Sequence, residues 1–486
     1  MVNEGATLGA AAARHLLRRT GFGALARDVS RYTGLSRGAA ADRLVGFKAK
    51  AFKPGGSYFE QAHDKWVTYI LKAKFPLMEK LALFWHDHFA VAIAKVIDVK
   101  RMGLYVGLLH QHCNGNLKTF VKAMNKDAAM MEFLDTVRND KGIPNENYAR
   151  ELQELFTLGV YDLAGQPNYT QADIVQIARA FTGWTYDGSN KPRFDDYRHD
   201  YAAEFPERGP KTLFAGRPGF PAGGASFASP EGATEIDQVV DVLFQHTDSQ
   251  GKNTVARRTA YRLCEYFAHP QPSLAFVDQI VAHSGFDVSF DIRRLVRSLL
   301  CHDEFYASAA GPPYTEASRK SVRWPIDYVV GTLRILGLKP RGRYQVIQGG
   351  SYRRVFDHLG NMGQTLMDPP SVFGWDWETS WVSSSTLLAR YNFARDIIMA
   401  RWGGGALKTD RLVNTGLTDP GAIVDAVTDL FGVRDQLSPA ERQVFVDYLT
   451  ENGTVPSIDL RNWDVRNTKL NGLFALVMQS PAYQLH

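Results

Sequence analysis

Apolar residues recur at the three- and four-residue spacing of α-helices along most of this 486-residue chain. In the first part of the chain the pattern predicts two short helices within 8–31, interrupted at Gly21 and Gly23, followed by Tyr58–Leu71, Pro76–Phe89, Val99–Cys113, Leu117–Met124, Asp127–Leu134, Asn145–Phe156 and Thr170–Thr182. Later helices are predicted over Glu235–Phe244, Thr254–Ala268, Ser273–His283, Ile292–Leu300, Trp324–Leu336, Tyr352–Leu359, Thr386–Arg401, Gly421–Phe431, Pro439–Leu449 and Asn467–Gln479.

Two stretches lack this periodicity. Residues 186–234 are rich in Gly, Pro, Asp and aromatic residues, and 367–384 is aromatic and irregular. The pattern therefore predicts a mostly α fold, a large multi-helix array with two long irregular loop regions and under about 10% strand. We divide the chain into an N-terminal helical part (1–185), an irregular loop insertion (186–234) and a C-terminal helical part (235–486), and expect them to form one compact unit.

Composition is that of a globular protein with an ample core. Hydrophobic residues make up 45% of the chain and charged residues 22%, and the net charge of +5 is scattered rather than concentrated on one element. This distribution argues against nucleic-acid binding. No apolar run of about 18 residues is present, so we expect no membrane span.

The cysteines and the N-terminus add little chemistry. Cys113, Cys264 and Cys301 lie far apart with no CxxC spacing, which argues against a disulfide framework and a cysteine-built zinc site. Arg18 and Arg19 form a twin arginine, but no long apolar segment follows them. We expect either a cytoplasmic protein or a periplasmic or secreted one whose leader has been removed.

His86 and His88, in the string FWHDHF, are the first candidate site. On a straight helix they would point roughly 160° apart, so they could share a metal only if the helix ended near Trp85. One interpretation is a pair of core histidines bonded to carbonyl or carboxylate groups. The other is a metal-binding or catalytic role, with His86 and His88 as the metal ligands.

The second candidate is the predicted helix over 145–156. On a helical wheel Glu151 lies at the edge of the apolar face, next to Glu154 and Asn147, with Arg150 nearby. Two acids on a partly buried face must be paired, protonated or bound to a cation. Two interpretations of Glu151 and Glu154 remain: they belong to a structural ion-pair network, or they bind a metal or act as acid and base. We expect Glu151 to be mostly buried and bonded to a basic group or a cation, so that its truncation to Ala costs several kcal/mol if a charged partner is left unpaired.

Polar residues also gather in both irregular stretches. The first contains Asp195, Asp196, Arg198, His199, Asp200 and Lys211, a composition that suits a binding site as well as an ordinary loop. The second contains Trp375, Trp377 and Trp381, which could form a stacking platform for sugar or peptide, or a packed plug. Motifs for a serine-hydrolase elbow, a P-loop, a dinucleotide fold and an HExxH metalloprotease are missing.

Several strings resemble one family. HLLRRTGFG, FWHDHFAV, PNENYARELQELFTLGV, YTQADIVQIARAFTGWTY and MGQTLMDPPSVFGWDWETSWVS occur in order, from about Ala11 to the C-terminus. Together they resemble the large bacterial family known as domain of unknown function 1800. The resemblance implies no settled activity. It implies a protein that is often exported and often encoded beside sulfatase-like proteins, which makes such a protein a candidate partner.

We weigh two hypotheses for the function. The first is an enzyme that hydrolyses a polysaccharide or ester, using a divalent metal or paired acids. Its catalytic residues would be Glu151, Glu154 and His199, and Arg150, Asn147, Trp375, Trp377 and Trp381 would bind substrate. The second is a non-catalytic protein that binds glycan or a partner protein through the Trp segment.

The enzyme hypothesis makes a geometric prediction. Three segments carry more polar groups than their apolar context needs: His86 with His88, Glu151 with Glu154, and His199 with Asp200. Isolated buried charges are costly, so these segments should satisfy one another. We expect at least two of the three to approach within about 4–6 Å.

Overall fold

The computed structural model confirms the mostly helical prediction, with helices accounting for 58% of the chain. It describes residues 1–309, 320–338, 344–346, 352–402 and 405–485. Strands within these ranges are only two or three residues long, in keeping with the low strand content expected.

The helices that were predicted lie close to their predicted positions. The helices before the long irregular region are α1 (Ala10–Thr20), α2 (Ala26–Tyr32), α3 (Arg37–Val45), α4 (Phe59–Leu71), α5 (Pro76–His88), α6 (Ile93–Val96), α7 (Val99–His112), α8 (Leu117–Met124), α9 (Ala128–Phe133), α10 (Asn147–Glu151) and α11 (Gln171–Ala180). Those after it are α12 (Glu235–Leu243), α13 (Thr254–Phe267), α14 (Leu274–Ser284), α15 (Phe286–Ser289), α16 (Ile292–Cys301), α17 (Pro325–Ile335), α18 (Val355–Asn361), α19 (Ser384–Met399), α20 (Pro420–Leu430), α21 (Pro439–Thr450), α22 (Trp463–Val465), α23 (Asn471–Gln479) and α24 (Pro481–Gln484). Among these, the nine-residue helix α3 and the short helices α6, α15, α22 and α24 were not predicted.

The described strands form small antiparallel sheets. In the irregular region β1 (Trp184–Tyr186) pairs with β2 (Pro192–Phe194), and β3 (Thr212–Leu213) pairs with β4 (Ala225–Ser226). A further sheet has the order β6-β5-β7-β8 and contains β5 (Tyr344–Val346), β6 (Tyr352–Arg353), β7 (Ala400–Trp402) and β8 (Gly405–Ala406). The helix expected over Tyr352–Leu359 therefore starts late, at Val355, because its first two residues belong to β6.

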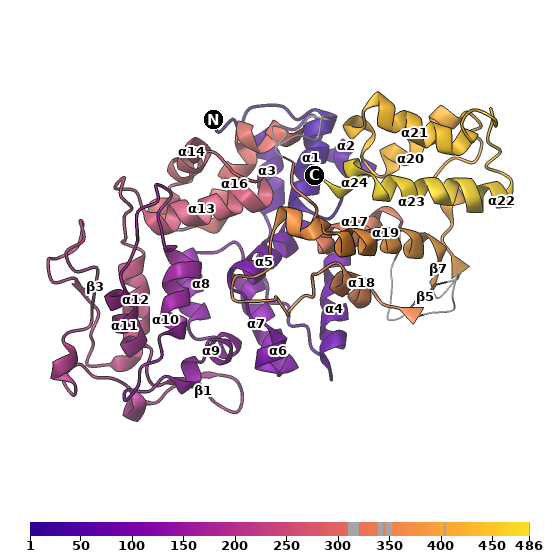
Figure 1. Ribbon diagram of the computed structural model, residues 1–486. Helices are drawn as coiled ribbons and strands as arrows, with labels where there is room; N and C mark the ends of the chain where they lie inside the picture. The colour runs from indigo at the N-terminus through magenta and orange to yellow at the C-terminus, as the bar shows by residue number, and fades with distance from the viewer. Residues whose placement is uncertain (310–319, 339–343, 347–351, 403–404, 486) are drawn as a thin grey trace.

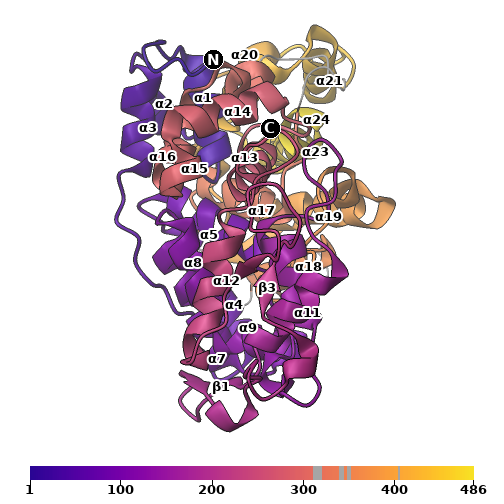
Figure 2. The ribbon, with the colours of Figure 1, turned by 90° about the vertical axis from the view of Figure 1, so that its left-hand side faces the viewer.

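Segments distant in sequence pack together throughout the molecule. Both views show α3 beside α16 (Figures 1 and 2). The C-terminal helices lie against α1, where Arg14 forms an ion pair with Asp435 at 2.6 Å. Buried apolar side chains form one cluster that extends from Leu8 to Tyr483. No helix in the described ranges combines the length and apolarity that crossing a membrane requires.

The predicted helix over 145–156 changes type part-way. The α-helix α10 continues into a π-helix, η2 (Leu152–Thr157), in which the main-chain N–H groups of Leu158 and Gly159 both donate to the Gln153 oxygen at 2.9 Å. Gly159 ends the segment with φ +83°, as a glycine at a helix C-terminus commonly does. A π turn widens the helix, so a wheel drawn at 100° per residue misplaces the side chains that follow Glu151.

Candidate functional site

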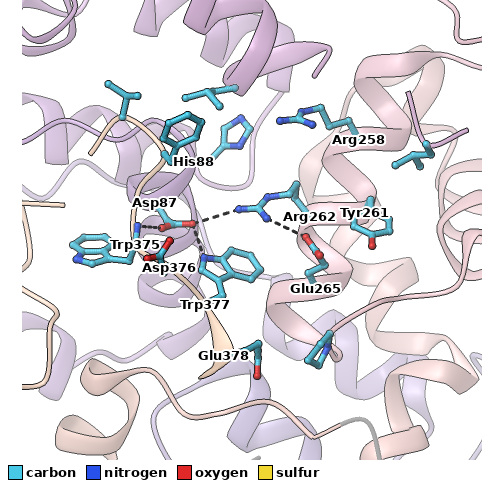
Figure 3. Close-up of a pocket in the computed structure, with 15 residues that line it drawn as sticks. Asp87, His88, Arg258, Tyr261, Arg262, Glu265, Trp375, Asp376, Trp377 and Glu378 are labelled. Atoms are coloured by element: carbon cyan, nitrogen blue, oxygen red, sulfur yellow. Dashed lines mark hydrogen bonds and ion pairs between the residues drawn. The ribbon is translucent and has the colours of Figure 1, made fainter. Parts of the chain in front are cut away.

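A polar cavity of about 550 Å³ lies between the end of α5, one face of α13 and the segment 372–378 (Figure 3). Its polar and aromatic lining consists of Asp87, His88, Arg258, Tyr261, Arg262, Glu265, Trp375, Asp376, Trp377 and Glu378. A larger groove, about 840 Å³, lies beside Phe52 and Tyr69, and the Glu79 carboxylate at that groove already bonds to His110 at 3.0 Å. We take the first cavity as the candidate site because it gathers four carboxyl groups with two arginines.

Helix α13 supplies one wall of the cavity. Arg258, Tyr261, Arg262 and Glu265 recur at i, i+3, i+4 and i+7, which places them on a single face. The end of this helix is held by Arg19, which is buried and donates to the Phe267 and Tyr266 oxygens, both at 2.7 Å. A cation bound to the last carbonyls of a helix satisfies acceptors that lack a partner within the helix.

The segment 372–378 is fixed to the end of α5 through Asp87. One oxygen of the buried Asp87 carboxylate accepts a hydrogen bond from the Trp375 N–H at 2.8 Å, and the other accepts one from Trp377 Nε1 at 3.0 Å. Gly374 packs so closely here, with φ +82°, that a Cβ at this position would collide with the Asp87 carboxylate. The string GWDW thus encodes a close backbone approach and two donors for one acid.

Asp87, Glu265 and Glu378 of the cavity are protonated more readily than in water. Burial raises the pKa of Asp87 to about 6, and the negative charge of Asp376 adds to the effect. Burial also raises the pKa of Glu265, against the opposing influence of Arg262, and that of Glu378. Perturbed acids in a cavity are a physical sign of a functional site.

Arg262 connects two of these acids. Its guanidinium lies 3.1 Å from Glu265 and 3.7 Å from Asp87, and its centre is 4.1 Å from the centre of the Trp377 ring. In the view of Figure 3, the Trp377 ring lies between Glu265 and Asp376. The exposed Asp376 and the partly exposed Glu265 are therefore the acids best placed to meet a ligand.

His88 faces the cavity and His86 does not. Helix α5 continues through His88, so the condition for a shared metal is not met. His86 is fully buried: its Nε2 accepts the Met367 N–H at 2.9 Å and its Nδ1 lies 3.0 Å from the Tyr105 hydroxyl. Both ring nitrogens are occupied and burial lowers the pKa of His86 to about 3, so the structure places it among core histidines.

The acids of the second candidate lie outside the cavity lining. Glu151 is buried, with 8% of its surface exposed, yet its carboxylate has no hydrogen bond or ion pair within the described ranges. The expected bond to a basic group is therefore not formed, because Arg150 pairs with Glu146 at 3.0 Å. The Glu154 carboxylate accepts the Tyr169 hydroxyl at 3.3 Å instead.

Asn147 and His199 also lie outside the cavity lining, and their side chains bond to other groups. The Asn147 side chain donates to the Leu134 oxygen at 3.3 Å. His199 is fully buried, and its Nε2 lies 3.2 Å from both Lys211 Nζ and a Glu235 oxygen. The structure therefore places His199 in a closed ionic cluster rather than in the open cavity.

The three tryptophans do not form an open platform. Trp375 and Trp381 are each only 3% exposed, and Trp381 packs against Trp324 in the core. Only Trp377 is partly exposed among the three. The segment is chiefly a packed plug, and Trp377 with the edge of Trp375 contributes to the cavity lining.

The end of α5 and the π-helix are in contact, but among the described residues no polar side chains of the three named segments are paired with one another. His88 Nε2 donates to the Phe156 oxygen at 3.2 Å, which joins the end of α5 to the π-helix. Arg258 Nη2 donates to the Glu154 oxygen at 2.9 Å, which joins the same π-helix to α13. The contact is made by main-chain groups, and the Glu151 and Glu154 carboxylates take no part in it.

The comparison with known proteins agrees with the resemblance described above. The family described as "Protein of unknown function (DUF1800)" matches residues 15–485. The chain belongs to the DUF1800 family. Its description assigns no activity, and neither a curated protein nor a solved structure matches the chain.

Within the ranges that the structure describes, no three His, Cys, Asp or Glu side chains are grouped in a way that could hold a metal ion.

The sequence interpretation also missed Arg258, Tyr261, Arg262 and Glu265. Their spacing on a predicted helix was a readable signal, because a polar stripe at i, i+3, i+4 and i+7 needs a polar environment to face.

Glu151 provides a stability test in the DUF1800 chain. Burial and the charge of Glu154 raise its pKa to about 7, although Arg150 opposes them. A raised folded-state pKa favours the native state below the unfolded pKa, and this contribution is lost as the pH rises through 7. We expect Glu151→Gln to stabilise the fold by about 2 kcal/mol at pH 8 and by little at pH 4, measured by urea unfolding.

The matched control is Glu207→Gln, which removes an acid that is 69% exposed. It should shift the unfolding free energy by less than about 0.5 kcal/mol at either pH. A Glu151→Gln variant that loses stability at pH 8 would show that the carboxylate has a partner after all.

Proposed function

We propose that this protein hydrolyses a polysaccharide in the cavity between α5, α13 and 372–378, with carboxyl groups as its acid and base. The observation that carries the proposal is Glu265, a partly exposed carboxyl group whose pKa is raised by burial. It lines the cavity together with the exposed Asp376 and the Trp377 ring. Glycoside hydrolysis by proteins commonly uses such a pair of acids, one protonated and one ionised.

In this proposal Glu265 is the general acid. Its raised pKa keeps the proton on the carboxyl group to higher pH than in a free glutamate, so it can protonate the oxygen that leaves as the C–O bond breaks. Asp376 is the base that takes a proton from the attacking water, whose oxygen forms the new bond to carbon. Arg262 orients Glu265 by donating a hydrogen bond to its carboxyl oxygen at 3.1 Å, a contact that either protonation state can accept.

The lining favours a glycosidic bond over an ester. None of the residues described around the cavity is Ser, Thr or Cys, the usual nucleophiles of ester hydrolysis. Aromatic rings, which commonly pack against sugars, are present in Tyr261 and Trp377. This set suits two-carboxylate chemistry on a chain of sugars.

The test is release of reducing ends from a panel of polysaccharides by wild type, Glu265→Gln and Asp376→Asn. We expect each variant to lower kcat by at least about 100-fold, the usual scale of a general acid or base. Activity of the wild type should fall as the pH rises through the raised pKa of Glu265, because the acid form is lost. The control Glu207→Gln should keep full activity.

Two results would count against hydrolysis at this site. If Glu265→Gln and Asp376→Asn retain full activity, the reaction takes place elsewhere. If the wild type binds a polysaccharide at the cavity but releases no product under any condition, the non-catalytic glycan-binding hypothesis replaces the enzyme.

A further inference from the structure

Arg258 contributes a positive charge to the cavity wall, and among the described residues no carboxylate forms a direct ion pair with it, although the charges of Glu265 and Glu154 act on it from further away. Its Nη2 donates to the Glu154 main-chain oxygen, and no carboxylate of the described residues lies within ion-pair distance of its guanidinium. Arg262, one turn later on α13, is paired with both Glu265 and Asp87. The acids of the cavity thus neutralise Arg262 and leave Arg258 open to a ligand.

The surroundings of Arg258 make this open charge costly. Its Nε is buried and has no hydrogen-bond partner. Burial and the neighbouring charge of Arg262 lower the pKa of Arg258 to about 10, against the opposing charges of Glu265 and Glu154. A cation held in this way destabilises the empty protein, and an anion in the cavity would offset the cost.

The fold makes room for this guanidinium. A Cβ at Gly159, where φ is +83°, would lie 2.5 Å from Nη1 of Arg258. The glycine that ends the π-helix therefore lets the arginine extend past the main chain toward the cavity. In Figure 3 the Arg258 guanidinium points from α13 toward the His88 side of the cavity.

His88 offers a neutral hydrogen-bond acceptor on the side of the cavity toward which Arg258 points. The Phe156 oxygen can only accept, so Nε2 of His88 carries the hydrogen and Nδ1 is left with a free lone pair. Burial and the charge of Arg258 lower the pKa of His88 to about 3, which keeps the ring neutral. A cation beside a neutral acceptor matches an anionic group next to a hydroxyl group.

We propose that the cavity selects a sugar that carries an anionic oxygen group, either a carboxylate or a sulfate ester, which Arg258 binds while His88 Nδ1 accepts a neighbouring hydroxyl. That the ligand is a sugar rests on the proposed function. The charge of the ligand rests on Arg258 alone. A guanidinium can donate two parallel hydrogen bonds to either anionic group.

Binding to the Glu265→Gln variant tests the proposal without any need for turnover. The ligands are a galacturonate tetramer with its neutral methyl ester, and a sulfated galactan oligomer with its desulfated form. We expect at least one anionic oligomer to bind more than 10-fold tighter than its neutral partner. The pair with the larger difference in affinity shows whether Arg258 binds a carboxylate or a sulfate ester.

Variants of Arg258 complete the test. In the Glu265→Gln background, Arg258→Gln should abolish the preference for the anionic oligomer, and Arg258→Lys should retain part of it. Because Arg258→Gln also removes the hydrogen bond to the Glu154 oxygen, affinity for the neutral oligomer is the control: loss of a ligand contact weakens binding of the anionic oligomer alone, whereas loss of a purely structural arginine would weaken binding of both. Equal binding of anionic and neutral oligomers, or a preference that survives Arg258→Gln, overturns the proposal.

The outcomes separate this proposal from hydrolysis itself. Anionic selectivity that depends on Arg258, in a protein that releases no product, supports the proposal and removes the enzyme. Hydrolysis that depends on Glu265 but acts equally on neutral chains overturns the proposal and leaves the enzyme standing.

Discussion

Glu235→Ala is expected to destabilise the fold by about 3–5 kcal/mol, the largest stability loss that we predict. Lys211 is fully buried and its Nζ lies 2.5 Å from a Glu235 oxygen, while Glu235 itself is 1% exposed. Removal of the carboxylate leaves the Lys211 ammonium buried beside His199, whose Nε2 lies 3.2 Å from Lys211 Nζ. Urea unfolding at pH 7 measures the loss.

A double variant separates the ion pair from packing. Lys211→Met with Glu235→Leu removes both charges and keeps apolar volume, so it should recover most of the stability lost in Glu235→Ala. The surface variant Glu207→Ala should change stability by less than about 0.5 kcal/mol. A neutral Glu235→Ala variant would mean that the His199 cluster is open to water, and would revive His199 as a candidate for catalysis.

Gly374→Ala is the substitution with the second largest expected effect. It should lower the free energy of unfolding by about 3 kcal/mol or more and abolish hydrolysis of polysaccharide at the cavity. An alanine Cβ would lie 2.6 Å from the Asp87 main-chain oxygen and would collide with its carboxylate, on a backbone with φ +82°. The segment carrying Asp376 and Trp377 would have to move away from α5. Chemical denaturation and the polysaccharide assay report the two consequences.

Gly165→Ala is the control that separates the strain of a positive φ from the collision of a Cβ at position 374 with Asp87. Gly165 has φ +83°, but a Cβ there meets nothing within 4 Å. It should cost only about 1 kcal/mol and leave activity intact. If both glycine variants lose the same small amount of stability, the close approach of Gly374 to Asp87 does not constrain the segment.

Local pattern was sufficient to predict most of the longer helices, but it missed α3 and the short helices α6, α15, α22 and α24. The interruption at Gly21 and Gly23 occurs as predicted, and the helix predicted from Thr170 begins there with a capping box formed by Thr170 and Asp173. These signals are local, because each depends on residues within a few positions of one another. The same reasoning failed at η2, since a π turn is decided by packing and not by a sequence period.

The candidate site was only partly predictable for a related reason. His88 and the Trp375–Trp377 segment were singled out as unusual and do line the cavity. Glu151 and His199 were also unusual, but one lies outside the cavity and the other pairs within a closed cluster. Periodicity can show that a polar group is buried, but only the tertiary contacts show whether it faces a ligand or another side chain.

The most direct test of the central claim is the structure of the Glu265→Gln variant determined with a bound oligosaccharide from the binding panel. We expect a sugar ring between the side chain at position 265 and Asp376, in contact with Trp377, with its anionic group bound to Arg258. An oligosaccharide bound elsewhere, for example in the groove beside Phe52 and Tyr69, with this cavity unchanged, would contradict the account.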